Sequence, residues 1–389
     1  MKKVKLSVVC NILNGFAFQS DKYVSSGLRI IRIANVQKGY IEDKLPCFYP
    51  IESKEEYKKY QLYEDDLLIS LTGNVGRVAL MDKKFLPALL NQRVACLRIK
   101  DVTKVDKHYL FSVLNSDLFE DSCIRSAKGV AQKNISTDWL KEFEITLPSL
   151  EEQKAIANKL DKVTALINKR KEQLAKLDQL VKSRFIEMFG EPESNPMHWE
   201  MLPLENCLTV LGGYAFKSEE FKASGIPVLR IGNINTGVFT PTNMVYWAKD
   251  VSLERYQVLP GDLVISLTGT VGKDDYGNVC ILGNAYPLYY LNQRNAKLNL
   301  GESLNKHYLS ELLKFSQIKK KLTGISRGVR QANISNRDIL NLVVPIPPIE
   351  LQDQYAAFVE QTDKSKLAIQ QSLEQLETLK KSLMQKYFG

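Results

Sequence analysis

The stretch DLLISLTGNVG, residues 66–76, occurs a second time as DLVISLTGTVG, residues 262–272. In each copy a short apolar run, Leu67–Leu71 or Leu263–Leu267, ends at a Thr-Gly pair. This pattern is typical of a buried strand followed by a turn. A repeat of this length, 196 positions apart, predicts a chain made of two copies of one unit.

Outward from this stretch, further motifs recur in the same order, with an offset that stays between 196 and 201. They are GFAFQS and GYAFKS (15–20 and 213–218), LRIIRIANV and IPVLRIGNI (28–36 and 226–234), NQR (91–93 and 292–294), HYL (108–110 and 307–309), and GVxQxNIS (129–136 and 328–335). A period near 199 is too long for a solenoid, so each copy is expected to be a domain with an appendage.

The appendage is predicted to be a long helix. The residues Ser149-Leu150-Glu151-Glu152 form a capping box, and both copies end in Phe-Gly, at residues 189–190 and 388–389. Apolar residues between these signals have coiled-coil spacing. They are Leu160, Val163, Ile167, Leu174, Leu177, Val181 and Met188 in the first copy, and Val359, Ile369, Leu373, Leu376 and Leu383 in the second. Arg170 and Arg184 interrupt the stripe, and they either fix its register or face a partner.

These signals predict an α+β chain in which two mixed α/β domains are separated by a long antiparallel two-helix coiled coil, with a pseudo-two-fold internal repeat. The domains are expected at residues 1–148 and 191–347, and the helices at 149–190 and 348–389. Within the domains, segments 107–120 and 306–321 have helical patterns. Because the second helix should run back along the first, the C-terminus is expected near the first domain.

Composition excludes several classes of protein. The net charge is +9, from 53 basic and 44 acidic residues, which permits a polyanionic partner without proving one. The six cysteines are spread singly, which argues for reduced buried thiols and against a zinc site or a disulfide framework. No apolar stretch approaches the roughly 20 residues that cross a bilayer, and the N-terminus lacks signal-peptide features. We therefore expect a cytoplasmic protein without a membrane partner.

The repeat, with its D-L-x-I-S-x-T-G-x-V-G, N-Q-R and G-V-x-Q-x-N-I-S motifs, resembles the specificity (S) subunit of Type I restriction–modification enzymes over essentially all 389 residues. A proline followed by a helix containing E-x-Q, at Glu151–Gln153 and Glu350–Gln352, adds to this resemblance. It implies that each domain is a target recognition domain for one half of a split double-stranded DNA site. It also implies that the helices space the half-sites and dock two methyltransferase (M) subunits, through which restriction (R) subunits join.

The resemblance further implies that this chain performs no catalysis and carries no cofactor, while S-adenosylmethionine, ATP and Mg²⁺ belong to the partner subunits. The residues agree, because the chain contains neither an N-P-P-Y-like or D-P-P-Y-like tetrapeptide nor a phosphate-binding G-x-x-x-x-G-K-[ST] loop. Asp66 and Asp262 precede apolar strands without the Glu-x-Lys of a nuclease, so capping of the strand is favoured over metal binding. The repeated His108 and His307 are favoured as packed imidazoles.

Two domains that read different sequences are expected to share a framework and to differ where they touch bases. Thr72-Gly73 and Thr268-Gly269 are therefore favoured as turns, whereas for Arg93 and Arg294 phosphate contact and a structural salt bridge remain equally open. Amide and guanidinium side chains suit base edges and phosphates. The candidate DNA contacts are Thr72, Asn74, Arg77, Arg93, Lys128, Gln132, Lys133, Asn134, Thr270, Lys273, Tyr276, Arg294, Arg327, Arg330, Gln331 and Asn333.

The stretches that do not repeat are expected to read the sequence. Asn91 follows Gly76 by 15 positions, and Asn292 follows Gly272 by 20. The five extra residues are interpreted as Lys273–Gly277, a loop of the second domain alone, so the two domains should prefer different half-sites. Three alternatives remain: the specificity subunit of a Type IIB-like enzyme, a self-contained enzyme with two catalytic domains, and a pure assembly scaffold.

Overall fold

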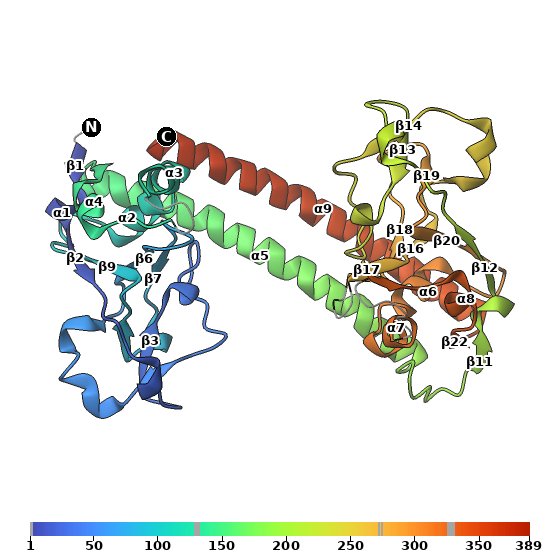
Figure 1. The fold of residues 1–389 in the computed structure, drawn as a ribbon, viewed down its shortest axis with the longest axis horizontal. Coiled ribbons are helices and arrows are strands. Elements are labelled where there is room, and N and C mark those ends of the chain that lie inside the picture. Colours follow the sequence, from blue (N-terminus) through green and yellow to red (C-terminus); the bar gives the residue numbers. More distant parts are fainter. Residues whose placement is uncertain (1–2, 128–132, 271–272, 274, 325–330) are drawn as a thin grey trace. The chain divides into compact units, whose positions relative to one another are not determined.

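The computed structural model describes residues 3–127, 133–270, 273, 275–324 and 331–389, with only the backbone of Gln331. The chain divides into two compact units (Figure 1). The first contains residues 1–171 and 371–389, and the second contains residues 172–370. Each unit therefore holds one of the two predicted domains and one part of each long helix.

In the first unit, two four-stranded sheets pack around buried side chains such as Leu68, Leu90 and Cys96. One sheet is antiparallel, with the order β2 (Cys10–Asn14), β9 (Val94–Ile99), β6 (Leu67–Ser70), β7 (Val78–Leu80). The other is mixed, with the order β4 (Phe48–Tyr49), β3 (Leu28–Ile31), β8 (Ala88–Leu90), β5 (Gln61–Leu62). A third pair joins β1 (Lys3–Lys5) to β10 (Glu144–Thr146).

Short helices close this domain, and the predicted helical segment 107–120 proves to be two of them. The first ends at Leu114, and Ser116 caps the next, because its Oγ accepts a hydrogen bond from the Phe119 N–H at 3.3 Å. The helices are α1 (Leu6–Val9), α2 (Lys107–Leu114), α3 (Asp117–Ser126) and α4 (Thr137–Glu142).

The second unit repeats this architecture, which confirms the predicted internal repeat. Its antiparallel sheet has the order β12 (Leu208–Gly212), β20 (Asn295–Leu300), β16 (Leu263–Ser266), β18 (Val279–Ile281). Its mixed sheet has the order β14 (Val245–Trp247), β13 (Ile226–Leu229), β19 (Tyr289–Leu291), β15 (Gln257–Val258). The remaining elements are β11 (Glu200–Pro203), β17 (Thr268–Thr270), β21 (Gln331–Asn333), β22 (Val343–Ile346), α6 (Lys306–Leu312), α7 (Ser316–Thr323) and α8 (Asn336–Leu340).

The two long helices, α5 (Leu150–Phe189) and α9 (Ile349–Phe388), have forty residues each, and each bound lies one residue inside the predicted range. In the first unit, Leu160 of α5 shares a core with Phe388 of α9, and Lys171 pairs with Glu377 at 2.9 Å. Residue numbers rise along α5 as they fall along α9 in these two pairs, so the helices are antiparallel, as predicted. The C-terminal Phe388 also contacts Tyr109 of the first domain, with ring centroids 5.7 Å apart, which confirms where α9 ends.

The helix parts in the second unit pack in the same sense. Val181 and Phe185 of α5 lie in one core with Tyr355 and Val359 of α9, and Lys366 pairs with Asp178 at 2.8 Å. Phe189 takes the position of Phe388, because it packs on Tyr308 with ring centroids 4.8 Å apart. In both units, therefore, the phenylalanine at the end of one long helix packs on a tyrosine of the domain.

The E-x-Q motif fastens each domain to the long helix that leaves it. Gln153 is fully buried, accepts the Asp106 N–H at 2.8 Å, and donates to the carbonyl oxygens of Lys104 at 3.0 Å and Pro148 at 2.9 Å. Gln352 makes the same three kinds of bond, to the Asn305 N–H at 2.9 Å and to the carbonyls of Ser303 at 2.9 Å and Pro347 at 2.8 Å. We call these two arrangements the glutamine joints.

Across the residues that the structure describes, no helix combines the length and the apolar character needed to cross a membrane.

Candidate nucleic-acid interface

Three repeated motifs that lie far apart in the sequence converge on one residue in each domain. In the first domain the Leu71 N–H donates to the Arg93 carbonyl at 3.0 Å, and the Leu71 carbonyl accepts the Ile135 N–H at 2.9 Å. In the second domain Leu267 makes the same two bonds, to the Arg294 carbonyl and from the Ile334 N–H, both at 2.8 Å. The S-L-T-G, N-Q-R and Q-x-N-I-S motifs thus form one site in each domain, which we call the motif junction.

The Thr-Gly pairs at this junction differ between the domains. Gly73 has a φ of 71°, which favours glycine and is consistent with the predicted turn. The turn predicted at Thr268-Gly269 is wrong, because Thr268–Thr270 forms strand β17 and pairs antiparallel with β21. Gly269 is required for a different reason: a Cβ there would lie 2.3 Å from Asp275 Oδ1.

In the first domain the junction gathers five of the predicted contacts. The Thr72 hydroxyl donates to Asn134 Oδ1 at 3.2 Å, and the Gly73 N–H bonds to the Lys133 carbonyl at 2.8 Å. Asn74, Arg93, Lys133 and Asn134 are exposed around this point. Arg77 is not presented with them, because its guanidinium bonds to Gln37 Oε1 at 2.5 Å.

In the second domain the junction presents Thr270, Arg294 and Asn333, which are all exposed. The Arg294 side chain borders two clefts, of about 530 Å³ and about 310 Å³. Among the described residues, neither Arg93 nor Arg294 forms an ion pair, so the structure shows no salt bridge for either side chain.

Tyr276 corrects the interpretation of the second-domain loop. Its side chain is only 4% exposed and its hydroxyl donates to the Thr323 carbonyl at 2.8 Å, so this tyrosine belongs to the core rather than to a DNA-contacting surface. Gly277, with a φ of 68°, occupies the place of Gly76, with a φ of 79°, and its N–H bonds to Ser266 as that of Gly76 bonds to Ser70. The insertion therefore precedes Tyr276, which takes the core position of Val75.

This loop is held at its base by Asp275. Its carboxylate accepts the Thr270 N–H at 2.8 Å and the Thr270 hydroxyl at 3.0 Å, and the Thr270 N–H is the main cause of the lowered pKa of Asp275. Lys273 is exposed on the same loop. The sequence did not single out Asp275 because its role depends on this local turn.

The strand aspartates have the structural role that the sequence favoured. Asp66 accepts the Tyr63 N–H at 2.8 Å and pairs with Arg98 at 2.7 Å, while Asp262 accepts the Leu259 N–H at 2.7 Å and pairs with Lys297 at 2.7 Å. In the part of the chain that the structure describes, no three His, Cys, Asp or Glu side chains are grouped to hold a metal ion.

The two repeated histidines differ in burial: the His307 side chain is 11% exposed, as expected for a packed imidazole, whereas the His108 side chain is 44% exposed and is not packed. His108 contacts Asp161 of α5 at 3.1 Å, and His307 contacts Glu360 of α9 at 3.5 Å. Each histidine therefore faces the long helix that leaves its own domain. Burial is the largest cause of the lowered pKa of His307. All six cysteines are free, and burial raises the pKa of the Cys10, Cys123 and Cys280 thiols to about 12. These three thiols are therefore protonated and poor metal ligands.

Four predicted contacts, Lys128, Gln132, Arg327 and Arg330, lie outside the described residues, as does the side chain of Gln331. The sequence reasoning missed a row of lysines, Lys319–Lys321 in α7, whose equivalents in α3 are Glu120, Asp121 and Ser122. Comparing charge at equivalent positions of the two copies would have found them.

The chain matches the family described as "Type I restriction modification DNA specificity domain" over residues 1–177 and 196–378. The chain belongs to this family of type I specificity subunits. Its role in such a system is DNA recognition.

Similar proteins agree with this assignment. The EcoBI specificity subunit of Escherichia coli is 23% identical, with 99% of this chain and 85% of the relative covered. The MjaVIII specificity subunit of Methanocaldococcus jannaschii is 27% identical, with 88% and 86% covered. In fold, the chain resembles the S subunit structure from M. genitalium, with a TM-score of 0.62, 17% identity, and 100% of this chain and 96% of that chain covered. These relatives favour a type I system over the Type IIB-like alternative.

Proposed function

We propose that each domain of this specificity subunit reads one half of a split DNA target, that the chain docks two methyltransferase subunits, and that it performs no chemistry of its own. The observation that carries the proposal is the motif junction, which recurs in both domains with the same backbone bonds. A shared framework that presents different side chains is suited to reading two different half-sites.

The side chains at the two junctions differ in a way that supports different half-sites. Asn74 and Lys133 are exposed in the first domain, whereas the second presents Thr270 and the loop with Lys273. Exposed arginines at the same point, Arg93 and Arg294, are suited to hold phosphates in both. Of the side chains around them, Asn74 and Lys133 in the first domain and Thr270 in the second are therefore suited to read bases while the arginines set position.

Docking of two methyltransferase subunits is supported by equivalent exposed leucines on the long helices. Leu180 of α5 is 48% exposed in the second unit, and Leu379 of α9, which lies 199 positions later, is 46% exposed in the first. Two equivalent apolar positions suit two copies of one partner. S-adenosylmethionine would then be bound by those partners, and ATP and Mg²⁺ by restriction subunits that join through them.

The test is methylation of DNA by this chain with its methyltransferase partner, followed by mapping of the methylated positions across a host genome. The expected result is one asymmetric bipartite motif, and no methyl transfer, nuclease or ATPase activity by the chain alone. Substituting Arg93→Ala should weaken DNA binding and lower the slope of log affinity against log salt by about one. The methylated motif should not change. Methyl transfer by the isolated chain, or methylation without a bipartite motif, would refute the proposal.

A further inference from the structure

The helices α3 and α7 occupy equivalent places in the two domains but carry opposite charge. Phe119 of α3 and Ile318 of α7 are the buried anchors, and they lie 199 positions apart. Around them α3 carries Asp117, Glu120 and Asp121, whereas α7 carries Lys319, Lys320 and Lys321. This difference in charge lies beside the motif junction, because Gly76 packs against α3 and Gly277 packs against α7.

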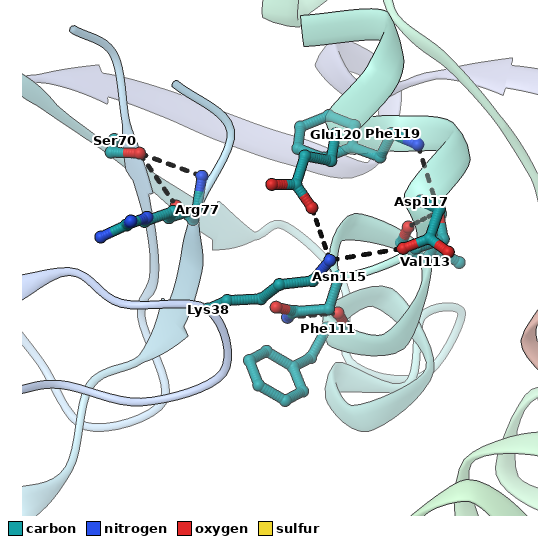
Figure 2. Close-up of polar contacts among 10 residues, drawn as sticks. Lys38, Ser70, Arg77, Phe111, Val113, Asn115, Asp117, Phe119 and Glu120 are labelled. Atoms are coloured by element: carbon teal, nitrogen blue, oxygen red, sulfur yellow. Dashed lines mark hydrogen bonds and ion pairs between the residues drawn. The ribbon is translucent and has the colours of Figure 1, made fainter. Parts of the chain in front are cut away.

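In the first domain two of the α3 carboxylates, Asp117 and Glu120, pair with a lysine of the same domain. Figure 2 shows the Lys38 ammonium reaching Glu120 and Asp117, at distances of 2.5 Å and 3.3 Å. Lys38 comes from the loop after Asn35, whose amide bonds to the Glu42 carbonyl. The space between this loop and α3 is therefore bridged by an ion pair.

The second domain replaces this bridge with a cleft. The Asn233 amide bonds to the Thr240 carbonyl as Asn35 does to Glu42, so Thr236 stands in the place of Lys38. The buried Lys319 instead donates to Asn278 Oδ1 at 2.6 Å. Between loop and helix the structure has a cleft of about 1020 Å³, which Thr236 and Lys319 both line.

The lining of this cleft is basic. It includes Lys273, Lys314, Lys319, Lys320 and Lys366. Its three carboxylates already have cationic neighbours, since Glu311 contacts Lys314 at 3.4 Å, and Asp178 and Asp363 contact Lys366 at 2.8 Å and 3.5 Å. Lys273 and Lys320 are exposed and form no ion pair with a described residue.

We propose that this lysine cleft binds backbone phosphates of the DNA beside the second half-site, and that the first domain has no such contact. The inference rests on the proposed function. Continuity with the motif junction favours DNA over an acidic protein segment, because Thr270 at the junction and Lys273 at the cleft belong to one loop anchored by Asp275. Ammonium groups bind phosphates as point charges, so the contact adds affinity without reading sequence.

The test compares two double variants of the full chain in complex with its methyltransferase. Lys273→Gln with Lys320→Gln removes two charges from the cleft, and Lys222→Gln with Lys249→Gln removes two exposed charges of the same domain outside it. Equilibrium binding to a duplex carrying the mapped target is measured at salt concentrations from about 50 to about 200 mM. Over this range the loss of affinity with added salt reports the number of phosphate contacts. The cleft variant should lower the slope of log affinity against log salt by about two, while the control keeps the parent slope.

Two outcomes would overturn the inference: an unchanged slope in the cleft variant, with or without a loss of affinity, or an equal loss of slope in the control. If the cleft variant instead fails to assemble with the methyltransferase while its own DNA slope is unchanged, the cleft serves an acidic protein segment. Methylation mapping separates these outcomes from failure of the proposed function. The cleft variant should retain the parent bipartite motif, whereas a parent without such a motif refutes the function itself.

Discussion

The amide of Gln352 is buried and makes three hydrogen bonds, so its replacement by an apolar side chain should be costly. Gln352→Leu would leave the Asn305 N–H and two carbonyls without partners, at a cost of about 2–4 kcal/mol of unfolding free energy. Thermal unfolding of the full chain should show a clear fall in the midpoint. Gln354→Leu, an exposed change two residues away, is the control, and equal shifts for both variants would contradict the role of the joint.

Single residues were predictable from sequence where their role depends on near neighbours, and not where it depends on packing. The structural roles of Asp66 and Asp262 follow from the strand they precede and from the missing Glu-x-Lys. Tyr276 was misjudged because the letters Val-Gly at 271–272 match those at 75–76, although Gly277 occupies the structural position of Gly76. Only the packed core shows that the tyrosine replaces Val75.

The long helices are the elements that should set the distance between half-sites. Inserting four residues near Arg170 of α5 and four near Ile369 of α9 lengthens each helix by about 6 Å, comparable with two base-pair steps of roughly 3.4 Å. The added helix rotation near 40° falls short of the roughly 70° of two base pairs, a mismatch that slight DNA twisting can absorb. Methylome mapping should show a spacer longer by one or two base pairs and unchanged half-sites. The original spacer, or altered bases in either half-site, would show that the helices do not measure distance.

The predictability of an element follows the range of the contacts that define it. Both long helices were placed within one residue at each end, because caps and apolar spacing are local signals. Strand β17 was mistaken for a turn because its partner β21 lies more than 60 residues later in the sequence. The same holds for the motif junction, whose members were all found as repeats although their meeting at Leu71 and Leu267 was not foreseen.

At the scale of the molecule, residues 1–190 alone should dimerise. In the first unit Leu160 of α5 is covered by the partly buried Leu383 and Met384 and by Phe388, which this truncation removes. An exposed apolar stripe seeks a partner, and a second copy restores an antiparallel pair. Light scattering should report a dimer, and with the methyltransferase the dimer should modify a palindrome of the first half-site.

A matched pair of substitutions tests the cause of this dimerisation. Leu160→Lys in the truncated chain should give a monomer, because Leu160 is 2% exposed in the intact unit. Leu166→Lys should leave the dimer intact, because that leucine is already 46% exposed. A monomeric parent truncation would show that the stripe uncovered by removal of α9 does not recruit a second copy.

The glutamine joints have a consequence for heredity. Because Gln153 and Gln352 make the same three bonds to their domains, the attachment does not depend on which sequence a domain reads. A genetic crossover within the codons for Pro148–Gln153 would exchange the whole first domain, while Gln153 keeps the same three bonds to the new domain. New DNA specificity can thus be inherited in a single recombination event, without the many point mutations that a redesigned protein surface would require.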